Sequence, residues 1–201
     1  MAFRVVIFDL GGVLVRLDSS RMLKQLSQET GKSEEQLKQI VTDPALLEPF
    51  ELGRVGPQRF FEQLSQRLGL SWSFDEFVTT WNSILSENPE TTWLLHRLRE
   101  RYTLAVLSNT DSLHDEYVRN TWPIFSHIHH WIASYQVGLR KPEPQIYELA
   151  LRRANVPPRA AVYVDDTEEF VMAARRLGLT AVHFTDGLKL EQELHAVGLH
   201  V

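Results

Sequence analysis

The sequence of 201 residues contains no cysteine. Disulfide bonds, thiolate metal sites and cysteine nucleophiles are therefore excluded, while this absence alone leaves the cellular compartment open. No apolar run is long enough to span a membrane, and the first one is too short for a signal peptide and ends at the charged Asp9. We therefore expect a cytoplasmic protein with no membrane partner.

Blocks of lysine and arginine are also missing. The chain has 26 acidic and 21 basic residues and a formal net charge of −5, which argues against a nucleic-acid partner. The sequence shows no internal repeats and no composition typical of disorder. With 43% hydrophobic residues, the chain can form one hydrophobic core, or one core and a small satellite domain. We expect small-molecule partners, and a monomer or a homodimer.

Residues 4–14, RVVIFDLGGVL, form the stretch around which the rest is organised. The run VVIF shows no alternation, so it is typical of a strand buried on both faces of a parallel sheet. The strand ends at Asp9, and Gly11 and Gly12 follow, where a backbone without side chains can turn sharply and approach a ligand. Open α/β sheets bind ligands at such strand ends, with free turn N–H groups suited to anions. Alternatively, Asp9 only closes a turn.

Residues 18–85 are predicted to form a series of helices with no convincing strand. Helices are expected at residues 20–30, 33–41, 57–68 and 73–85. A further helix is expected to begin at residues 43–44. Ser73 and Glu76 match a capping box, and the aromatic residues recur at helical spacing, which favours core packing over a cofactor site. The connection ELGRV differs, because it could present Glu51 or Arg54 outward.

From residue 89 onward, predicted helices and strands alternate. Strands are expected at residues 103–107, 132–134, 161–164 and 181–184, with helices at 89–101, 143–154, 167–177 and the end of the chain. This alternation predicts an α/β fold, a Rossmann-like and mostly parallel sheet with helices on both faces. Residues 1–15 and 86–201 would form this core. Residues 16–85 would be an inserted helical-bundle cap over the strand ends.

Polar residues follow the strand ends that this topology brings to one edge. They are Asp9, Ser108 with Asn109, and Asp165 with Asp166, and Lys141 lies near the start of a helix. Two facing carboxylates repel each other unless a cation lies between them, and oxygen ligands without histidine or cysteine suit Mg²⁺. A lysine and a hydroxyl beside them are what a phosphoryl group needs in its transition state.

The motifs resemble those of the haloacid-dehalogenase-like hydrolase superfamily, specifically its sugar-phosphatase-like and epoxide-hydrolase-amino-domain-like members with a helical cap. The resemblance covers essentially the whole chain. It rests on FDLGGVLV at 8–15, LSNT at 107–110, GLRKPEPQIY at 138–147 and VYVDDTEEF at 162–170, and ELGRV is similar to a segment of such caps.

The resemblance implies a role for each site residue. Asp9 would attack phosphorus to form an aspartyl-phosphate. The metal site would be completed by the carbonyl of Gly11 and the carboxylate of Asp165, with Asp166 assisting through water. The phosphoryl group or the rest of the substrate would be held by residues of several segments, namely Gly12, Arg54, Ser108, Asn109 and Lys141.

Two positions depart from the family pattern. Gly11 stands where the family usually has the acid that protonates the leaving group, and Phe170 stands where an asparagine often follows the paired aspartates. Some capped relatives share the glycine. An acid would then have to come from elsewhere, or be dispensable.

Three functions are compatible with these residues. The leading one is a Mg²⁺-dependent phosphatase of a small phosphorylated metabolite, a sugar phosphate by resemblance. The second is a metal-free dehalogenase of the same fold, although paired acids such as Asp165 and Asp166 argue against it. The third is a binding or regulatory protein that kept the fold and lost its acid.

Overall fold

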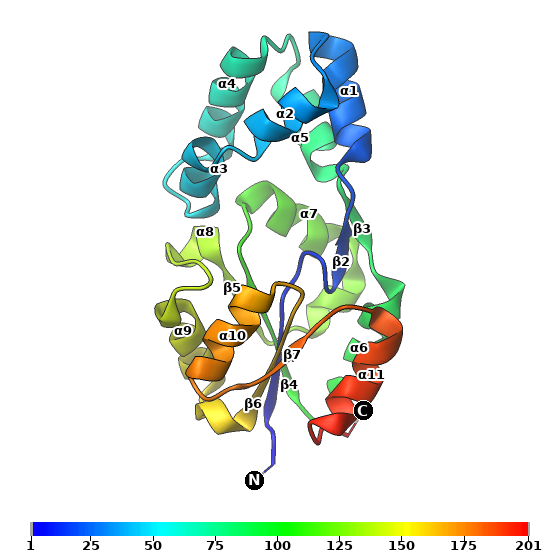
Figure 1. The fold of residues 1–201 in the computed structure, drawn as a ribbon, viewed down its shortest axis with the longest axis vertical. Helices are drawn as coiled ribbons and strands as arrows, with labels where there is room; N and C mark the ends of the chain where they lie inside the picture. Colours follow the sequence, from blue (N-terminus) through cyan, green and yellow to red (C-terminus); the bar gives the residue numbers. More distant parts are fainter. Residues whose placement is uncertain (1, 201) are drawn as a thin grey trace.

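The computed structural model describes residues 2–200, and its centre is a parallel five-stranded sheet with the order β5-β4-β1-β6-β7 (Figure 1). The strands are β1 (Val5–Phe8), β4 (Thr103–Ser108), β5 (His130–Ala133), β6 (Ala161–Asp165) and β7 (Thr180–His183). Phe8 lies opposite Val106 of β4 and Val164 of β6. The residues that follow these strands are therefore neighbours at the carboxyl edge of the sheet.

Successive residues of β1 point to opposite faces of the sheet, which explains its unbroken apolar run. Val5 and Ile7 pack in one buried cluster with α9 (Pro144–Ala154) and α10 (Glu168–Arg176). Val6 and Phe8 pack in another with α6 (Pro89–Leu98), α7 (Ser112–Thr121) and α11 (Gly187–Ala196). The predicted Rossmann-like α/β sheet with helices on both faces is confirmed.

A two-stranded antiparallel ribbon joins this sheet to the rest of the chain. It consists of β2 (Val15–Leu17) and β3 (Leu85–Glu87), with Leu17 opposite Leu85. The expectation of a helix through residue 85 was wrong, because α5 (Phe74–Asn82) ends earlier. The two strands stabilise each other across a long sequence separation, which no local pattern reveals. The predicted cap boundaries, residues 16 and 85, fall within this ribbon.

The helices between β2 and β3 form a bundle that lies apart from the sheet, at the top of Figure 1. They are α1 (Ser20–Thr30), α2 (Glu34–Val41), α3 (Pro44–Glu51), α4 (Pro57–Leu68) and α5. Capping boxes start α2 at Ser33 and α5 at Ser73. The rings of Phe50 and Phe60 stack at 4.2 Å in the bundle core, so the interpretation of the aromatic residues as packing is confirmed.

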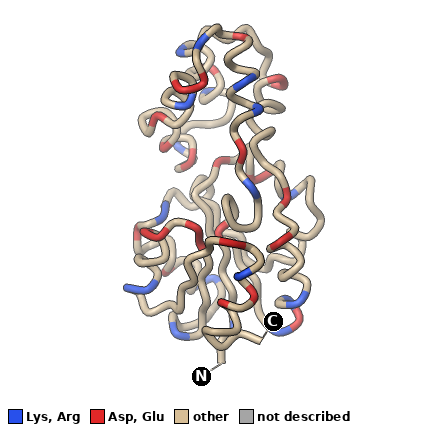
Figure 2. Tube along the Cα trace, turned by 45° about the vertical axis from the view of Figure 1, so that its right-hand side comes forward, with Lys and Arg blue, Asp and Glu red and all other residues tan. Residues whose placement is uncertain are grey.

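Short helices complete the chain, namely α8 (Ser134–Val137), η1 (Pro123–His127) and η2 (Pro158–Ala160). Within residues 2–200, no helix has both the length and the apolar character needed to cross a bilayer. Figure 2 shows acidic and basic residues interspersed over both the bundle and the sheet domain.

Trp81 of α5 attaches one side of the bundle to α7 of the sheet domain. Its indole stacks on the His114 ring at 5.4 Å, its Nε1–H donates to Asp111 Oδ2 at 3.1 Å, and its carbonyl lies 3.1 Å from His114 Nε2. Burial opposes the charge of His114, but the Asp111 carboxylate raises the pKa of this imidazole above its ordinary value. The polar atoms of Asp111 and His114 are thus engaged in holding the bundle.

The loop after α3 attaches the other side of the bundle to α8. Ser134 Oγ donates to the carbonyl of Glu51 at 2.6 Å, and Arg140 lies 2.5 Å from Glu48 Oε1. Gly53 has φ +68°, and a Cβ at this position would lie 2.1 Å from the carbonyl oxygen of Tyr135. Only glycine allows this close approach between the two parts of the chain.

We expect Gly53→Ala to loosen this attachment, because the new methyl group overlaps a backbone oxygen. This overlap should lower the free energy of unfolding by about 1–3 kcal/mol, in addition to the cost of placing alanine at a positive φ. Gly31→Ala is the matched control, since Gly31 also has φ +68° but nothing lies within 4 Å of its added Cβ. Denaturant unfolding of both variants measures the difference. Equal stability of the two would show that the loop adapts without cost.

Candidate functional site

Asp9 lies directly after β1, in the middle of the sheet edge, and only 7% of its surface is exposed. Its N–H donates to the carbonyl of Val164 at 2.8 Å, and its Oδ1 accepts the N–H of Leu10 at 2.7 Å. Burial raises the pKa of Asp9 to about 7. The positive charge of Lys141 opposes this rise, and the negative charge of Asp165 adds to it. The carboxylate is thus fixed in position and shielded from water.

The glycine turn after Asp9 brings the backbone against Asp166. Gly12 has φ +81°, and a Cβ there would lie 2.0 Å from Asp166 Oδ2, so the turn requires glycine. At Gly11 an added Cβ would instead meet Leu17 of β2, with Cδ1 3.0 Å away. No acidic side chain stands at position 11, and a leucine covers the space beside it.

Lys141 is almost completely buried between two carboxylates. Its Nζ lies 2.9 Å from Asp9 Oδ1 and 2.7 Å from Asp165 Oδ2. Burial disfavours its charge, but Asp9 and Asp165 raise the pKa of Lys141 above the ordinary range. Its cationic head is therefore held at the edge of the sheet, next to Asp9.

Asn109 holds the backbone of Lys141 with both ends of its side-chain amide. Oδ1 accepts the N–H of Lys141 at 2.8 Å, and Nδ2 donates to its carbonyl at 3.0 Å. Asn109 was expected to bind substrate. The structure shows its amide positioning the lysine, and the expected contact with substrate stays a prediction.

The paired aspartates after β6 differ in their surroundings. Asp165 is fully buried, and its Oδ1 accepts the N–H of Thr167 at 2.8 Å, whereas Asp166 is exposed. One oxygen each from Asp9, Asp165 and Asp166 lies within 4.8 Å of the others. Opposite ligand oxygens of an octahedral magnesium site are separated by roughly 4.2 Å, so this cluster of carboxylates has the chemistry of such a site and a similar span.

Ser108 ends β4 on the other side of Asp9 and is 3% exposed. Among the described residues 2–200, its hydroxyl makes one long contact, 3.5 Å, with the carbonyl of Asn109, which leaves it available to a ligand. Ser108, Asn109 and Gly11 line a cavity of about 320 Å³ between the helical bundle and the sheet. Arg54, also expected to bind substrate, is exposed on its loop and does not line this cavity.

The family model described as haloacid dehalogenase-like hydrolase matches residues 3–178. The chain belongs to this family. The matched range includes the strand ends that lie around Asp9.

Curated members of the haloacid dehalogenase-like family with similar sequences include phosphatases. The sesquiterpene phosphatase astK of Aspergillus oryzae is 28% identical, and the match covers 96% of this chain and 95% of that protein. The D-ribitol-5-phosphate phosphatase of Bacteroides thetaiotaomicron is 22% identical, with 96% and 97% covered.

Solved structures of this hydrolase family share the fold. A family enzyme from Bacteroides thetaiotaomicron, crystallised with magnesium and inorganic phosphate, superposes with a TM-score of 0.83 at 25% identity, covering 92% of this chain and 95% of that one. A structure of an L-2-haloacid dehalogenase has a TM-score of 0.71 at 23% identity, with 97% and 100% covered, which shows the fold alone.

Tyr163 was not identified from the sequence, and Phe170 was noted only as a departure from the family pattern. The Tyr163 hydroxyl donates to Asp165 Oδ2, and the Phe170 ring lies 4.9 Å from Lys141 Nζ. Tyr163 was detectable in principle, because residues two apart in a strand share one face of the sheet. Phe170 stands where the family often has asparagine, and its ring face stabilises the buried ammonium by a cation–π contact.

Proposed function

We propose that this hydrolase is a Mg²⁺-dependent phosphatase that hydrolyses a small phosphomonoester through an aspartyl-phosphate on Asp9. The observation that carries the proposal is the cluster of Asp9, Asp165 and Asp166 oxygens within 4.8 Å, beside the buried Lys141. The similar phosphatases, and the family structure that holds magnesium and phosphate, support it. A cytoplasmic location stays a prediction.

The metal site would be formed by carboxylate oxygens of Asp9 and Asp165, by Asp166 and by the carbonyl of Gly11. Hard oxygen ligands of this kind suit Mg²⁺, and the residues present fit it in number and spacing. Magnesium bound there would supply positive charge to the phosphoryl oxygens.

Asp9 is the nucleophile in this proposal. Among residues 2–200, the contacts of its carboxylate with Leu10 and Lys141 fall on Oδ1, which leaves Oδ2 to attack phosphorus. The bond from phosphorus to the leaving oxygen breaks, and the leaving group departs as an alkoxide that takes its proton from water. Water then attacks the phosphorus of the aspartyl-phosphate, releasing phosphate and restoring the Asp9 carboxylate.

The negative charge of the transferred phosphoryl group would be stabilised by Lys141, by the Ser108 hydroxyl and by the N–H of Gly11. The N–H of Gly12 is not available, because it donates to the carbonyl of Val15 at 2.8 Å. Groups that stabilise charge in this way act most strongly where burial has removed water. Both residues meet this condition, because only 1% of the Lys141 side chain and 3% of Ser108 are exposed. The two residues hold the charge without having to reorganise.

A dehalogenase of the same fold is the second candidate. It would displace halide without a metal and needs no acid for an oxygen leaving group, which agrees with Gly11. The exposed Asp166 carboxylate near Asp165 disfavours it, because the single positive charge of Lys141 faces three grouped carboxylates and the remaining like charges repel each other. A non-catalytic binding protein is the third candidate.

The metal requirement gives the direct test. We expect activity on a generic aryl phosphate to disappear in chelator and to return with Mg²⁺. Asp165→Asn should weaken the apparent magnesium affinity at least tenfold, and more than Asp166→Asn, because Asp165 is fully buried and electrostatic interactions are stronger there. Magnesium titrations of turnover and of melting temperature measure both effects.

Equal turnover in chelator and in magnesium would contradict the phosphatase proposal and favour the dehalogenase. Halide release from a 2-haloacid in chelator would then identify that activity. If the protein turns over neither the aryl phosphate nor the 2-haloacid but still binds inorganic phosphate, the non-catalytic binding protein would be favoured.

A further inference from the structure

The cavity next to Ser108 has walls that are mainly hydrocarbon. Its volume is about 320 Å³, and the residues that line its walls from the bundle and the ribbon include Leu17, Met22, Leu23, Val41, Leu47 and Trp81. At its other end stand Gly11, Ser108 and Asn109. A molecule whose phosphate lies against Asp9 would therefore place its organic group among these apolar side chains.

Most of the polar groups in the walls are already paired. Asp111 accepts the N–H groups of Leu113 and His114 and the indole N–H of Trp81, while both ring nitrogens of His114 are engaged. The Glu51 carboxylate lies 3.6 Å from Arg140. Hydroxyl groups of a sugar would lose their water there without finding equivalent partners, at a cost of roughly 1–3 kcal/mol each.

Leu17 is a large apolar side chain that is exposed to solvent. It is 55% exposed, although it lines the cavity and lies beside Gly11. A substrate with an apolar group would cover this surface and gain about 25 cal/mol for each Å² removed from water.

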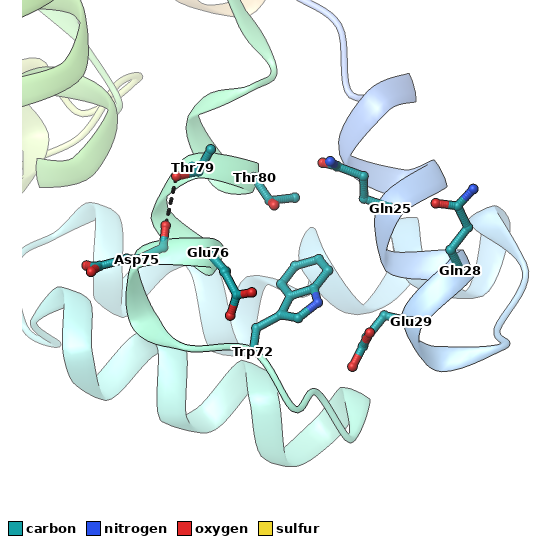
Figure 3. A pocket seen from close by; sticks show the side chains of 8 residues that line it. All are labelled: Gln25, Gln28, Glu29, Trp72, Asp75, Glu76, Thr79 and Thr80. Carbon is teal, nitrogen blue, oxygen red and sulfur yellow. Dashed lines mark hydrogen bonds between the residues drawn. The ribbon is translucent and has the colours of Figure 1, made fainter.

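A larger cavity, of about 540 Å³, lies in the helical bundle, and Asp9 and Lys141 do not line it. Figure 3 shows that its side chains come from α1, α5 and the loop before α5, and none comes from the sheet domain. Its Glu76 accepts the N–H of Ser73 at 2.7 Å in the capping box, and the Thr79 hydroxyl donates to the Asp75 carbonyl. These polar groups serve the helix itself.

We infer that the substrate is a phosphomonoester with a compact apolar organic group, and not a polyhydroxylated one. This inference rests on the proposed phosphatase function. The cavity has room for about ten non-hydrogen atoms, taking roughly 30 Å³ for each as for a liquid water molecule. A branched or cyclic hydrocarbon group of this size fits the walls, and the sugar phosphate expected from the motifs matches them less well.

The test compares cyclohexylmethyl phosphate with glucose 6-phosphate. Both carry a six-membered ring on a CH₂–O–P unit, so they differ mainly in the ring hydroxyls and the ring oxygen. We expect kcat/KM to be at least 100-fold higher for cyclohexylmethyl phosphate. The corresponding phosphonates, which are not hydrolysed, should show the same order of affinity in a thermal-shift titration.

Leu17→Gln places a polar group in the cavity at a position that is already exposed. It should lower kcat/KM for cyclohexylmethyl phosphate at least tenfold and that for glucose 6-phosphate less, so that the preference between the two substrates narrows. Leu188→Gln is the matched control, because Leu188 is 77% exposed and does not line the cavity.

A preference for glucose 6-phosphate, or an unchanged preference in Leu17→Gln, would overturn this inference and leave the phosphatase proposal intact. Tighter binding of the cyclohexylmethyl phosphonate without turnover of any phosphate would overturn the phosphatase proposal, while the apolar binding cavity would stand. Each result thus separates the two proposals.

Discussion

Asp9→Asn is expected to abolish phosphate hydrolysis, with a loss on the order of 10⁴-fold or more, the scale seen when an enzyme loses its nucleophile. The amide cannot attack phosphorus. Its oxygen can still accept the N–H of Leu10 and the ammonium of Lys141, which contact Oδ1 of Asp9 at 2.7 and 2.9 Å. The variant should therefore fold like the parent protein.

Two measurements distinguish loss of the nucleophile from loss of the fold. Unfolding by denaturant should remain cooperative in Asp9→Asn. Beryllium fluoride with Mg²⁺, which mimics a phosphoryl group on a carboxylate, should stabilise the parent protein against heat and leave the variant unaffected. Asp75→Asn, at an exposed position in the first turn of α5, is the matched control and should keep full activity and the full response. Appreciable turnover by Asp9→Asn would contradict the assignment of the nucleophile.

The glycine at position 11 should produce a steep dependence of the chemical step on the acidity of the leaving alcohol. A positioned general acid is typically worth roughly 10²–10⁴-fold in rate, and it helps poor leaving groups most. Here Gly11 offers no acid, and Leu17 Cδ1 lies 3.0 Å from where its Cβ would be. We therefore expect aryl phosphates to react much faster than primary alkyl phosphates, and a hexose 1-phosphate to react faster than the 6-phosphate at equal binding.

Single-turnover rates for a series of substituted phenyl and alkyl phosphates measure this dependence. The steady-state level of phosphorylated Asp9 should also be high, because the same missing carboxylate would have activated water. A rate that is independent of leaving-group acidity would show that another residue supplies the proton.

Gly11→Asp in a Leu17→Ala background tests the cause of this dependence. Removing the leucine side chain leaves room for the new carboxyl group, which should accelerate alkyl phosphates at least tenfold and aryl phosphates little. Leu17→Ala alone is the control. An equal gain for both classes of substrate would point to improved binding and not to acid catalysis.

The catalytic edge of the sheet was predictable because its signals are local. An apolar run without alternation predicts a buried parallel strand, and parallel strands end at the same edge, so Asp9, Ser108 and Asp165 were expected to meet. Lys141 has no such signal in its own segment. It was expected only near the start of a helix, with a charge suited to a phosphoryl group, and the structure brings its Nζ to 2.9 Å from Asp9 Oδ1.

The contacts that position and cover this site were not predictable. Asn109 was expected to touch substrate, yet its amide is engaged by the Lys141 backbone, 32 residues further along the chain. The ribbon of β2 and β3 was missed because each strand has only three residues and is stabilised by the other. Interactions between distant segments leave no periodic pattern in either one.

The preference of the site for one organic group of the substrate over another was also not predictable from local sequence patterns. Leu17, Met22 and Val41 have the same apolar character as the residues of the bundle core, and their spacing is compatible with packing alone. They line a cavity because the ribbon and the Trp81 contact place the bundle above the strand ends. Chemistry at the strand ends follows from local sequence, since each strand carries its own polar terminus. The shape of the space above them depends on tertiary packing, since its walls come from segments that meet only in the folded chain.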